Sequence, residues 1–260
     1  MSGKKVAQTL GIKAAHYDQL VFTDADCEPV SPNWLRHMQS NFMQKTDIVL
    51  GYGGYKAAKG LLNKWIRIDT VYIAMQYLNF ALKGIPYMGV GRNMAYRKSL
   101  FFANKGFASH LHIAAGDDDL FVNETSNRYN TSIEIHPESF TISEPKETWK
   151  DWIRQKRRHY TTWIKYKKSH KRLLSTEIIS RLLFFITGIV LLSFWKFVAY
   201  VVIILLLREI SLAILFKLTM KRLKERNLLL LSLIYDIIWP LFAGFLLARN
   251  KFASKTPKWK

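Results

Sequence analysis

The feature that most limits how this chain can fold is a succession of three long apolar runs after Glu177. They read IISRLLFFITGIVLLSF, FVAYVVIILLLREISLAILF and LLLLSLIYDIIWPLFAGFLLA. Each is close to the roughly 20 residues that an α-helix needs to cross a bilayer. Core helices of soluble proteins are seldom this apolar, and three in succession are rarer. The sequence therefore predicts membrane helices at about residues 177–194, 196–216 and 228–248, in a membrane region covering 176–250 and followed by a basic tail over 251–260.

The distribution of positive charge indicates a membrane partner. The formal net charge is +20, and charged residues make up 22% of the chain but thin out after Glu177. Lysine and arginine gather from Arg154 to Arg172, before the first apolar run, and from Lys217 to Arg226, before the last one. This placement fits the positive-inside rule better than a face that binds nucleic acid. We expect a multi-pass protein of the cell membrane, with lipid as a partner, no nucleic acid, and its N-terminal part in the cytoplasm.

The last apolar run conflicts with this rule. A third crossing would put the basic residues from Arg249 to Lys260 outside. Asp236 and Pro240 lie within the last run, and Arg208 and Glu209 lie within the second. Since charges inside a membrane usually face protein or water, a re-entrant or interfacial element is the alternative. Three crossings are kept as the nominal prediction.

Residues 1–175 have the pattern of an α/β domain. An amphipathic helix over 4–17 leads into Leu20-Val21-Phe22, which is typical of a strand buried on both faces. A helix that feeds such a strand implies an α/β sheet. The single cysteine, Cys27, excludes an intrachain disulfide, and we assign it no chemistry. Further elements are expected as a helix from Ser31-Pro32 to about Gln44, a strand over 47–50, one or two helices over 61–82, a strand around Ile133 and Ile135, and a helix over 149–166.

Two acidic motifs follow apolar stretches in this domain. Asp24 and Asp26 come directly after the first strand, where ligands bind at the carboxyl ends of a parallel sheet. Paired carboxylates suit Mg²⁺ or Mn²⁺ on a diphosphate, although an Asx turn is the simpler interpretation. Asp117, Asp118 and Asp119 could provide the base that deprotonates an attacking hydroxyl. The alternative is a solvated acidic loop or the N-terminus of a helix.

A third motif, QKRRHY, lies on the helix over 149–166. Gln155 and Arg158 are one turn apart on one face, and the arginine fork suits a diphosphate. The alternative is a basic patch next to the membrane.

TDAD, GDDDL and QKRRH, in this order and before membrane helices, resemble the family 2 glycosyltransferases related to cellulose and poly-N-acetylglucosamine synthases. GKKVAQTLGIKAA and GVGRNMAYRKSLF are also similar to that family. The resemblance covers roughly residues 3–175. It implies a partial GT-A (Rossmann-like) catalytic domain followed by a transmembrane helical region, and a glycosyltransferase that builds cell-envelope polysaccharide.

The resemblance also implies a role for each motif. Asp24 and Asp26 would hold the metal and the donor diphosphate, with Asp26 the more direct ligand. One aspartate of the triple would be the catalytic base; the E-D-x-D-L spacing favours Asp117 over Asp118. Gln155 and Arg158 match Q-x-x-R-W, but His159 replaces the tryptophan, so processive synthesis is in doubt. The residues implied for the acceptor and sugar pocket are Gly91, Arg92, Asn93 and His159.

The activity implied is inverting transfer of a sugar from a nucleotide-diphosphate sugar to a glycan or lipid-linked acceptor, with Mg²⁺ or Mn²⁺. A polyprenyl-phosphate glycosyltransferase and a non-catalytic membrane scaffold are the alternatives. In the family, a first strand with residues that recognise the base should precede Gly3, and it is missing here. The resemblance therefore implies a catalytic domain that lacks its N-terminal part, and leaves open whether the chain is active alone.

Overall fold

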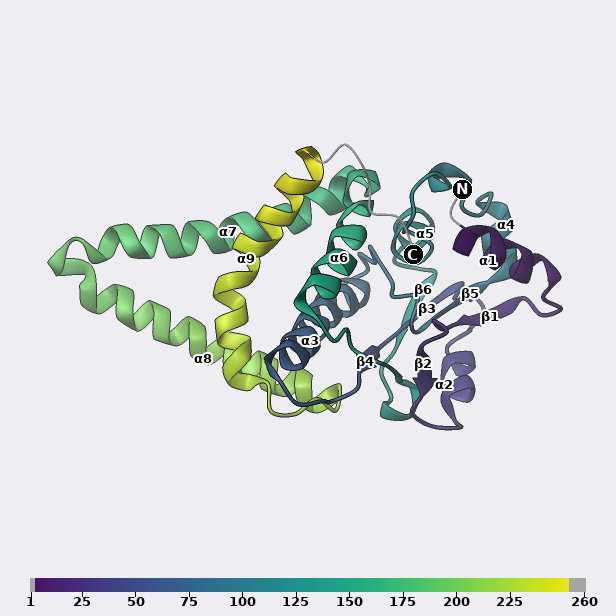
Figure 1. The fold of residues 1–260 in the computed structure, drawn as a ribbon, viewed down its shortest axis with the longest axis horizontal. Helices are drawn as coiled ribbons and strands as arrows, with labels where there is room; N and C mark the ends of the chain where they lie inside the picture. The colour runs from purple at the N-terminus through teal and green to yellow at the C-terminus, as the bar shows by residue number, and fades with distance from the viewer. Residues whose placement is uncertain (1–2, 253–260) are drawn as a thin grey trace.

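A mixed four-stranded sheet forms the centre of the N-terminal part (Figure 1). This computed structural model describes residues 3–252, and their side chains from residue 3 to 246. Strands β1 (Gln19–Phe22), β3 (Ile48–Gly51) and β6 (Thr131–Glu134) run in one direction, and β5 (Met94–Arg97) lies antiparallel between β1 and β3. The expected parallel sheet is therefore wrong at β5. The carboxyl ends of the other three strands still meet at one edge.

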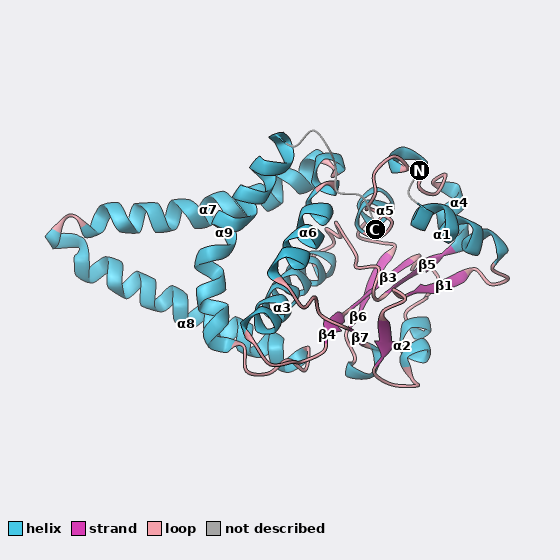
Figure 2. Cartoon of the chain, in the orientation of Figure 1, coloured by secondary structure: helices cyan, strands magenta, loops and turns pink. Residues whose placement is uncertain are grey.

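A second sheet extends this edge. It contains β2 (Cys27–Pro29), β7 (Thr141–Ser143) and β4 (Gly53–Tyr55), in that order (Figure 2). The turn that contains Asp24 and Asp26 joins β1 to β2, so it lies where the two sheets meet.

Side chains of β3 alternate between two cores, as the pleat of a strand requires. Ile48 and Leu50 belong to the main core, and Val49 packs with Met38 on the opposite face. Strand β1 is half-buried and lies at the sheet edge in the described part of the chain, so the prediction of a strand buried on both faces is wrong. The helices of this domain are α1 (Gly3–Ala14), α2 (Trp34–Ser40), α3 (Leu61–Leu82), α4 (Lys98–Ala103), α5 (Asp119–Thr125) and α6 (Trp149–Tyr160), with short 3-10 turns at η1 (Ala108–His110), η2 (Pro137–Ser139) and η3 (Thr162–Lys165).

Three of the predicted helices differ at their ends. Helix α1 ends at Ala14 and not at residue 17, and α2 ends at Ser40 and not near Gln44. Ser31 does not cap α2: its hydroxyl accepts a hydrogen bond from the backbone N–H of Asn33, and the helix begins only at Trp34. Helix α6 begins as expected after Thr148, whose hydroxyl accepts from the N–H of Asp151, but it ends at Tyr160 and continues as η3.

Three long helices follow, and each is long and apolar enough to cross a membrane. They are α7 (Lys168–Leu192), α8 (Val198–Arg222) and α9 (Leu229–Phe252). Helices α7 and α8 form a hairpin that projects from the α/β domain, whereas α9 runs across the open end of the hairpin (Figure 1). A short turn, η4 (Trp195–Phe197), joins the two arms. The predicted domain boundary at residue 175 falls inside α7, and the predicted basic tail lies, from residue 253 on, outside the described residues.

Candidate active site

Lys4 joins the two acidic motifs. Its Nζ lies 2.9 Å from Oδ1 of Asp24 and 2.7 Å from Oδ2 of Asp117. Burial alone would lower the pKa of Lys4, but the carboxylates of Asp117 and Asp24 raise it above its usual value, so the ammonium group remains charged. The turn after β1 and the segment before α5 therefore meet in one acidic cluster, formed by Asp24, Asp117 and Lys4, to which α1 supplies the cation.

The turn after β1 offers two oxygen ligands for a divalent cation. One ligand atom each from Asp24, Asp26 and Cys27 lie within 4.8 Å of one another. Magnesium and manganese prefer oxygen, and burial raises the pKa of the Cys27 thiol, whose sulfur lies 2.9 Å from Oγ of Ser143. Asp24 and Asp26 thus fit a hard cation that keeps water or phosphate in its other positions, and Cys27 does not.

The three consecutive aspartates have three different environments. Asp118 caps α5: Oδ1 accepts from the N–H of Asp119, and Oδ2 accepts from the N–H of Gly91, both at 2.8 Å. Asp119 is buried, and its Oδ2 accepts from the hydroxyls of Thr162 and Tyr166 in and after η3. Among the three, Asp117 forms the ion pair with Lys4.

Burial changes the acidity of two of these carboxyl groups. Burial and the charge of Asp118 raise the pKa of Asp117, while Lys4 lowers it. Burial and the same neighbour raise the pKa of Asp119 to about 7, against the hydrogen bonds from Thr162 and Tyr166. A carboxylate with a raised pKa is a stronger proton acceptor, which suits Asp117 for a base.

Helix α6 carries Gln155 and Arg158, and Gln155 contacts Tyr55 of β4. Nε2 of Gln155 donates to the hydroxyl of Tyr55 over 3.3 Å, and the guanidinium of Arg92 lies 4.3 Å from the centre of the Tyr55 ring. Burial lowers the pKa of Arg158, and the charges of Asp117, Asp118 and Asp24 oppose this. The contacts thus join the two acidic motifs through Lys4, and join the third motif to Tyr55 through Gln155.

The predicted pocket residues lie at different depths. Gly91 lies against Asp118, and a Cβ at Gly91 would lie 3.3 Å from Oδ2 of that carboxylate. His159 is exposed at the end of α6. Asn93 does not reach the surface, because its side chain is fully buried. Its amide donates to the carbonyls of Tyr52 and Ser139, and its Oδ1 accepts from the indole of Trp34.

Three residues of this site were not predicted. Lys4 and Lys5 lie within the expected amphipathic helix, and nothing in the spacing marks Lys4 as an ion-pair partner or Lys5 as buried. Nζ of Lys5 donates to the carbonyls of His110 and Ile113, which fastens α1 to the loop before Asp117. Tyr55 follows the glycines of β4, and only the contact with Gln155 indicates its place.

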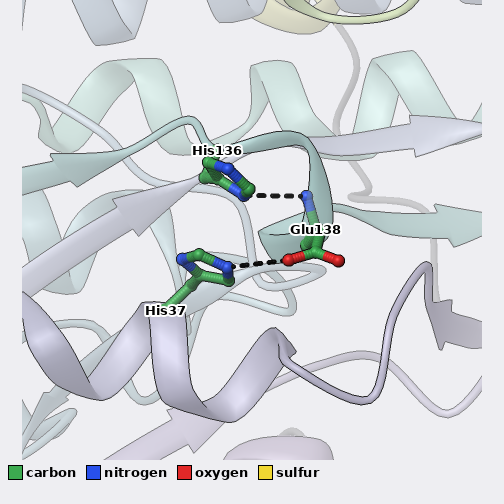
Figure 3. A group of neighbouring side chains, drawn as sticks. All are labelled: His37, His136 and Glu138. Atoms are coloured by element: carbon green, nitrogen blue, oxygen red, sulfur yellow. Dashed lines mark hydrogen bonds and ion pairs between the residues drawn. The ribbon is translucent and has the colours of Figure 1, made fainter.

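A second group of polar side chains is separate from the acidic cluster and consists of His37, His136 and Glu138 (Figure 3). The rings of His37 and His136 stack with their centres 4.1 Å apart. Nε2 of His37 lies 3.2 Å from Oε2 of Glu138, and Nδ1 of His136 accepts from the N–H of Glu138. These contacts hold α2 against η2, and the groups satisfy one another.

Comparison with known proteins gives one family. A family model described as "Glycosyl transferase family group 2" matches residues 20–248. A search of curated proteins found no match. Among solved structures, the mannosyltransferase PcManGT from Pyrobaculum calidifontis, in complex with GDP-Man and Mn²⁺, is similar over 94% of this chain and 68% of its own, with 16% sequence identity and a TM-score of 0.45.

Proposed function

This chain belongs to glycosyl transferase family group 2, and from that premise we propose that it is a membrane-bound inverting enzyme. It would move a sugar from a nucleotide-diphosphate sugar to a glycan or lipid-linked acceptor. The observation that supports this most directly is the Lys4 bridge, because it brings Asp24 and Asp117 to opposite sides of one ammonium group. A donor diphosphate at the first carboxylate would then have its sugar facing the second.

The proposed reaction is a single in-line displacement. The acceptor hydroxyl oxygen attacks the anomeric carbon, the bond from that carbon to the diphosphate oxygen breaks, and the hydroxyl proton passes to Asp117. The configuration inverts, and no covalent intermediate forms. Arg158 neutralises charge on the leaving diphosphate, and Gln155, Tyr55 and Arg92 line the pocket beside it.

Asp24 and Asp26 would hold Mg²⁺ or Mn²⁺ together with the diphosphate. When bound, the cation would supply Lewis-acid stabilisation of the leaving group. The side chains of this chain have separate tasks: Asp118 fixes Gly91 beside the base, and Asp119 holds η3 under the end of α6. We therefore assign the base to Asp117 and give the other two aspartates positioning roles.

The test uses membranes that contain the full chain, Mn²⁺ and a panel of labelled UDP- and GDP-sugars. We expect one label to move into lipid or polymer. D117N should lose turnover and retain Mn²⁺-dependent nucleotide binding, whereas D119N, its matched control, should retain much more turnover than D117N. Full activity of D117N would exclude Asp117 as the base.

Two alternatives give different results in the same membranes. A polyprenyl-phosphate glycosyltransferase would transfer label only when polyprenyl phosphate is added. A non-catalytic scaffold would show neither transfer nor Mn²⁺-dependent nucleotide binding. The meeting of Asp24 and Asp117 at Lys4 favours an enzyme over the scaffold, because a scaffold does not need the two acidic motifs to be close.

A further inference from the structure

Arg92 lies in the loop before β5, and its backbone is held at the second sheet. The hydroxyl of Thr141 in β7 donates to the carbonyl of Arg92 over 2.9 Å. Gly53 of β4 faces the arginine, because a Cβ at that glycine would lie 2.8 Å from Cβ of Arg92. One residue earlier, the N–H of Gly91 donates to Asp118. The segment that carries Arg92 therefore contacts both the aspartate triple and the second sheet.

The side chain of Arg92 is stacked on an aromatic ring. Its guanidinium lies 4.3 Å from the centre of the Tyr55 ring, and Nη1 donates to the carbonyl of Gly54 over a long 3.4 Å. Gln155 donates to the hydroxyl of Tyr55, which holds the ring next to the guanidinium. Because a guanidinium has five N–H donors, these contacts leave most of its hydrogen-bonding capacity for a ligand.

Four other arginines that are withdrawn from water have carboxylate partners. They are Arg67 with Glu225, Arg97 with Asp18, and Arg181 and Arg208 with Asp236. Arg92 is half-buried as well, but among the side chains of residues 3–246 no carboxylate forms an ion pair with it. A charge that loses part of its hydration is costly unless a counter-ion joins it, and an aromatic ring compensates for only part of the loss. The environment of Arg92 therefore indicates an anionic ligand.

The second sheet places such a ligand at a defined distance from the cation site. Tyr55 of β4 pairs with Ser143 of β7, and Ser143 pairs with Cys27 of β2, so the three residues form one row across the sheet (Figure 2). Sγ of Cys27 lies 2.9 Å from Oγ of Ser143, so these side chains share a face. Neighbouring strands are about 4.8 Å apart, which puts Tyr55 about 10 Å from Cys27, the residue after Asp26. One sugar attached to a diphosphate can span this distance.

We propose that Arg92 binds a carboxylate or phosphate group on a sugar substrate, beyond the donor diphosphate that Asp24 and Asp26 would hold. This inference rests on the proposed function and narrows its substrate to an acidic sugar or a sugar phosphate. The planar fork of the guanidinium suits two parallel hydrogen bonds to such a group, and the anion would supply the counter-charge that Arg92 lacks. The group belongs either to the transferred sugar or to the acceptor.

The donor arm of the test measures binding to the full chain in detergent with Mn²⁺. UDP-glucuronate and UDP-glucose differ only by a carboxylate in place of a hydroxymethyl group, and GDP-mannuronate and GDP-mannose form the matching pair. If the group is on the donor, the acidic member should bind roughly 10- to 100-fold more tightly, as hydrogen bonds to a charged group allow. R92M should remove this preference. R92K keeps the charge without the fork and should retain only part of the preference.

The acceptor arm uses membranes and the labelled donor that the transfer assay identifies. If acidic and neutral donors bind alike, the group is on the acceptor. The kcat/KM for a glycoside acceptor that carries a glucuronate or a 6-phosphate should then exceed that for the neutral glucoside by roughly 10- to 100-fold. R92M should bring the two values together.

Chemical modification tests Arg92 without turnover. Phenylglyoxal reacts with guanidinium groups, and peptide mass spectrometry measures the rate at each arginine. Glucuronate or glucose 6-phosphate should slow the modification of Arg92 several-fold, whereas glucose should not. The exposed Arg36 and Arg128 are internal controls whose rates should stay the same. Protection of Arg92 in a chain that transfers no sugar would leave the anion site in place and refute only the proposed reaction.

Three results would overturn the proposal. One is a preference for the acidic partner that persists in R92M. Another is a loss of affinity for UDP itself in R92M as large as the loss for the acidic donor, which would make Arg92 a ligand of the diphosphate. The last is equal treatment of acidic and neutral sugars in both binding and transfer, with no protection of Arg92 by either acid.

Discussion

Replacing Asp119 by asparagine should remove a pH dependence of stability. The carboxyl group is buried, and its pKa is raised by burial and by Asp118 to about 7, from 3.8. Between about pH 4 and pH 7 the folded protein therefore holds a proton that the unfolded chain releases. Since the folded state binds more protons in this window, the free energy of unfolding falls as the pH rises through it.

The size of this effect follows from the shift. About three pKa units at 1.36 kcal/mol each give on the order of 4 kcal/mol between pH 4 and pH 8. Asparagine at this position has nearly the same shape, and its Oδ1 can accept from Thr162 and Tyr166 as the carboxylate does. D119N should therefore exceed wild type by only about 1–2 kcal/mol at pH 5, where the proton release has begun, and by about 4 kcal/mol at pH 8, roughly 10 °C in Tm for a chain of this length.

The assay is thermal unfolding in detergent, followed by tryptophan fluorescence from pH 5 to pH 8. E147Q, which neutralises an exposed carboxylate, is the matched control. The Tm of E147Q should change with pH as that of wild type does. If the Tm of D119N changes with pH as that of wild type does, or if D119N is the less stable protein at pH 8, Asp119 is not a buried acid that gains a proton on folding.

Three further predictions concern the cation site and the contact with α9. D26N should weaken Mn²⁺ binding in the presence of a nucleoside diphosphate by tenfold or more, measured by calorimetry, and unchanged binding would remove Asp26 from the metal site. K4M should raise the affinity for Mn²⁺ several-fold when no nucleotide is present, because the cation no longer competes with an ammonium group; weaker binding would refute that competition. K156M should destabilise the folded protein by about 3–5 kcal/mol, since it leaves Asp69 buried without its cation, and adding D69N should recover most of the loss; a double variant no more stable than K156M would contradict this.

The parts of the fold that depend on local pattern could be predicted from the sequence. Long apolar runs indicated α7, α8 and α9, and short apolar or alternating runs indicated β1, β3 and β6, three of the seven described strands. Asp24 and Asp117 could be proposed as site residues because each follows or precedes an apolar element in a short motif. Each of these patterns lies within one short segment of the sequence.

The rest depends on contacts between distant segments. Lys4 forms an ion pair with Asp117, and Tyr55 accepts a hydrogen bond from Gln155 of α6, although the two residues of each pair are far apart in the sequence. The antiparallel place of β5 also follows from pairing and not from its own composition. Hydropathy alone also does not show that α9 packs on α3 and α6, because aromatic residues that face protein count the same as those that face lipid.

Helix α6 explains why the two predicted regions act as one folding unit. Successive residues of a helix point about 100° apart, so neighbours on α6 can contact different elements. Gln155 donates a hydrogen bond to Tyr55 of β4, and the next residue, Lys156, forms an ion pair with Asp69 of α3. Without α9, the face of α6 with Trp152 and Lys156 would expose a large ring to water and lose the tyrosine that Asp69 also binds. The residues that hold the helix of Gln155 and Arg158 in place are therefore supplied in part by the membrane region, and a chain cut at the predicted boundary would lose them.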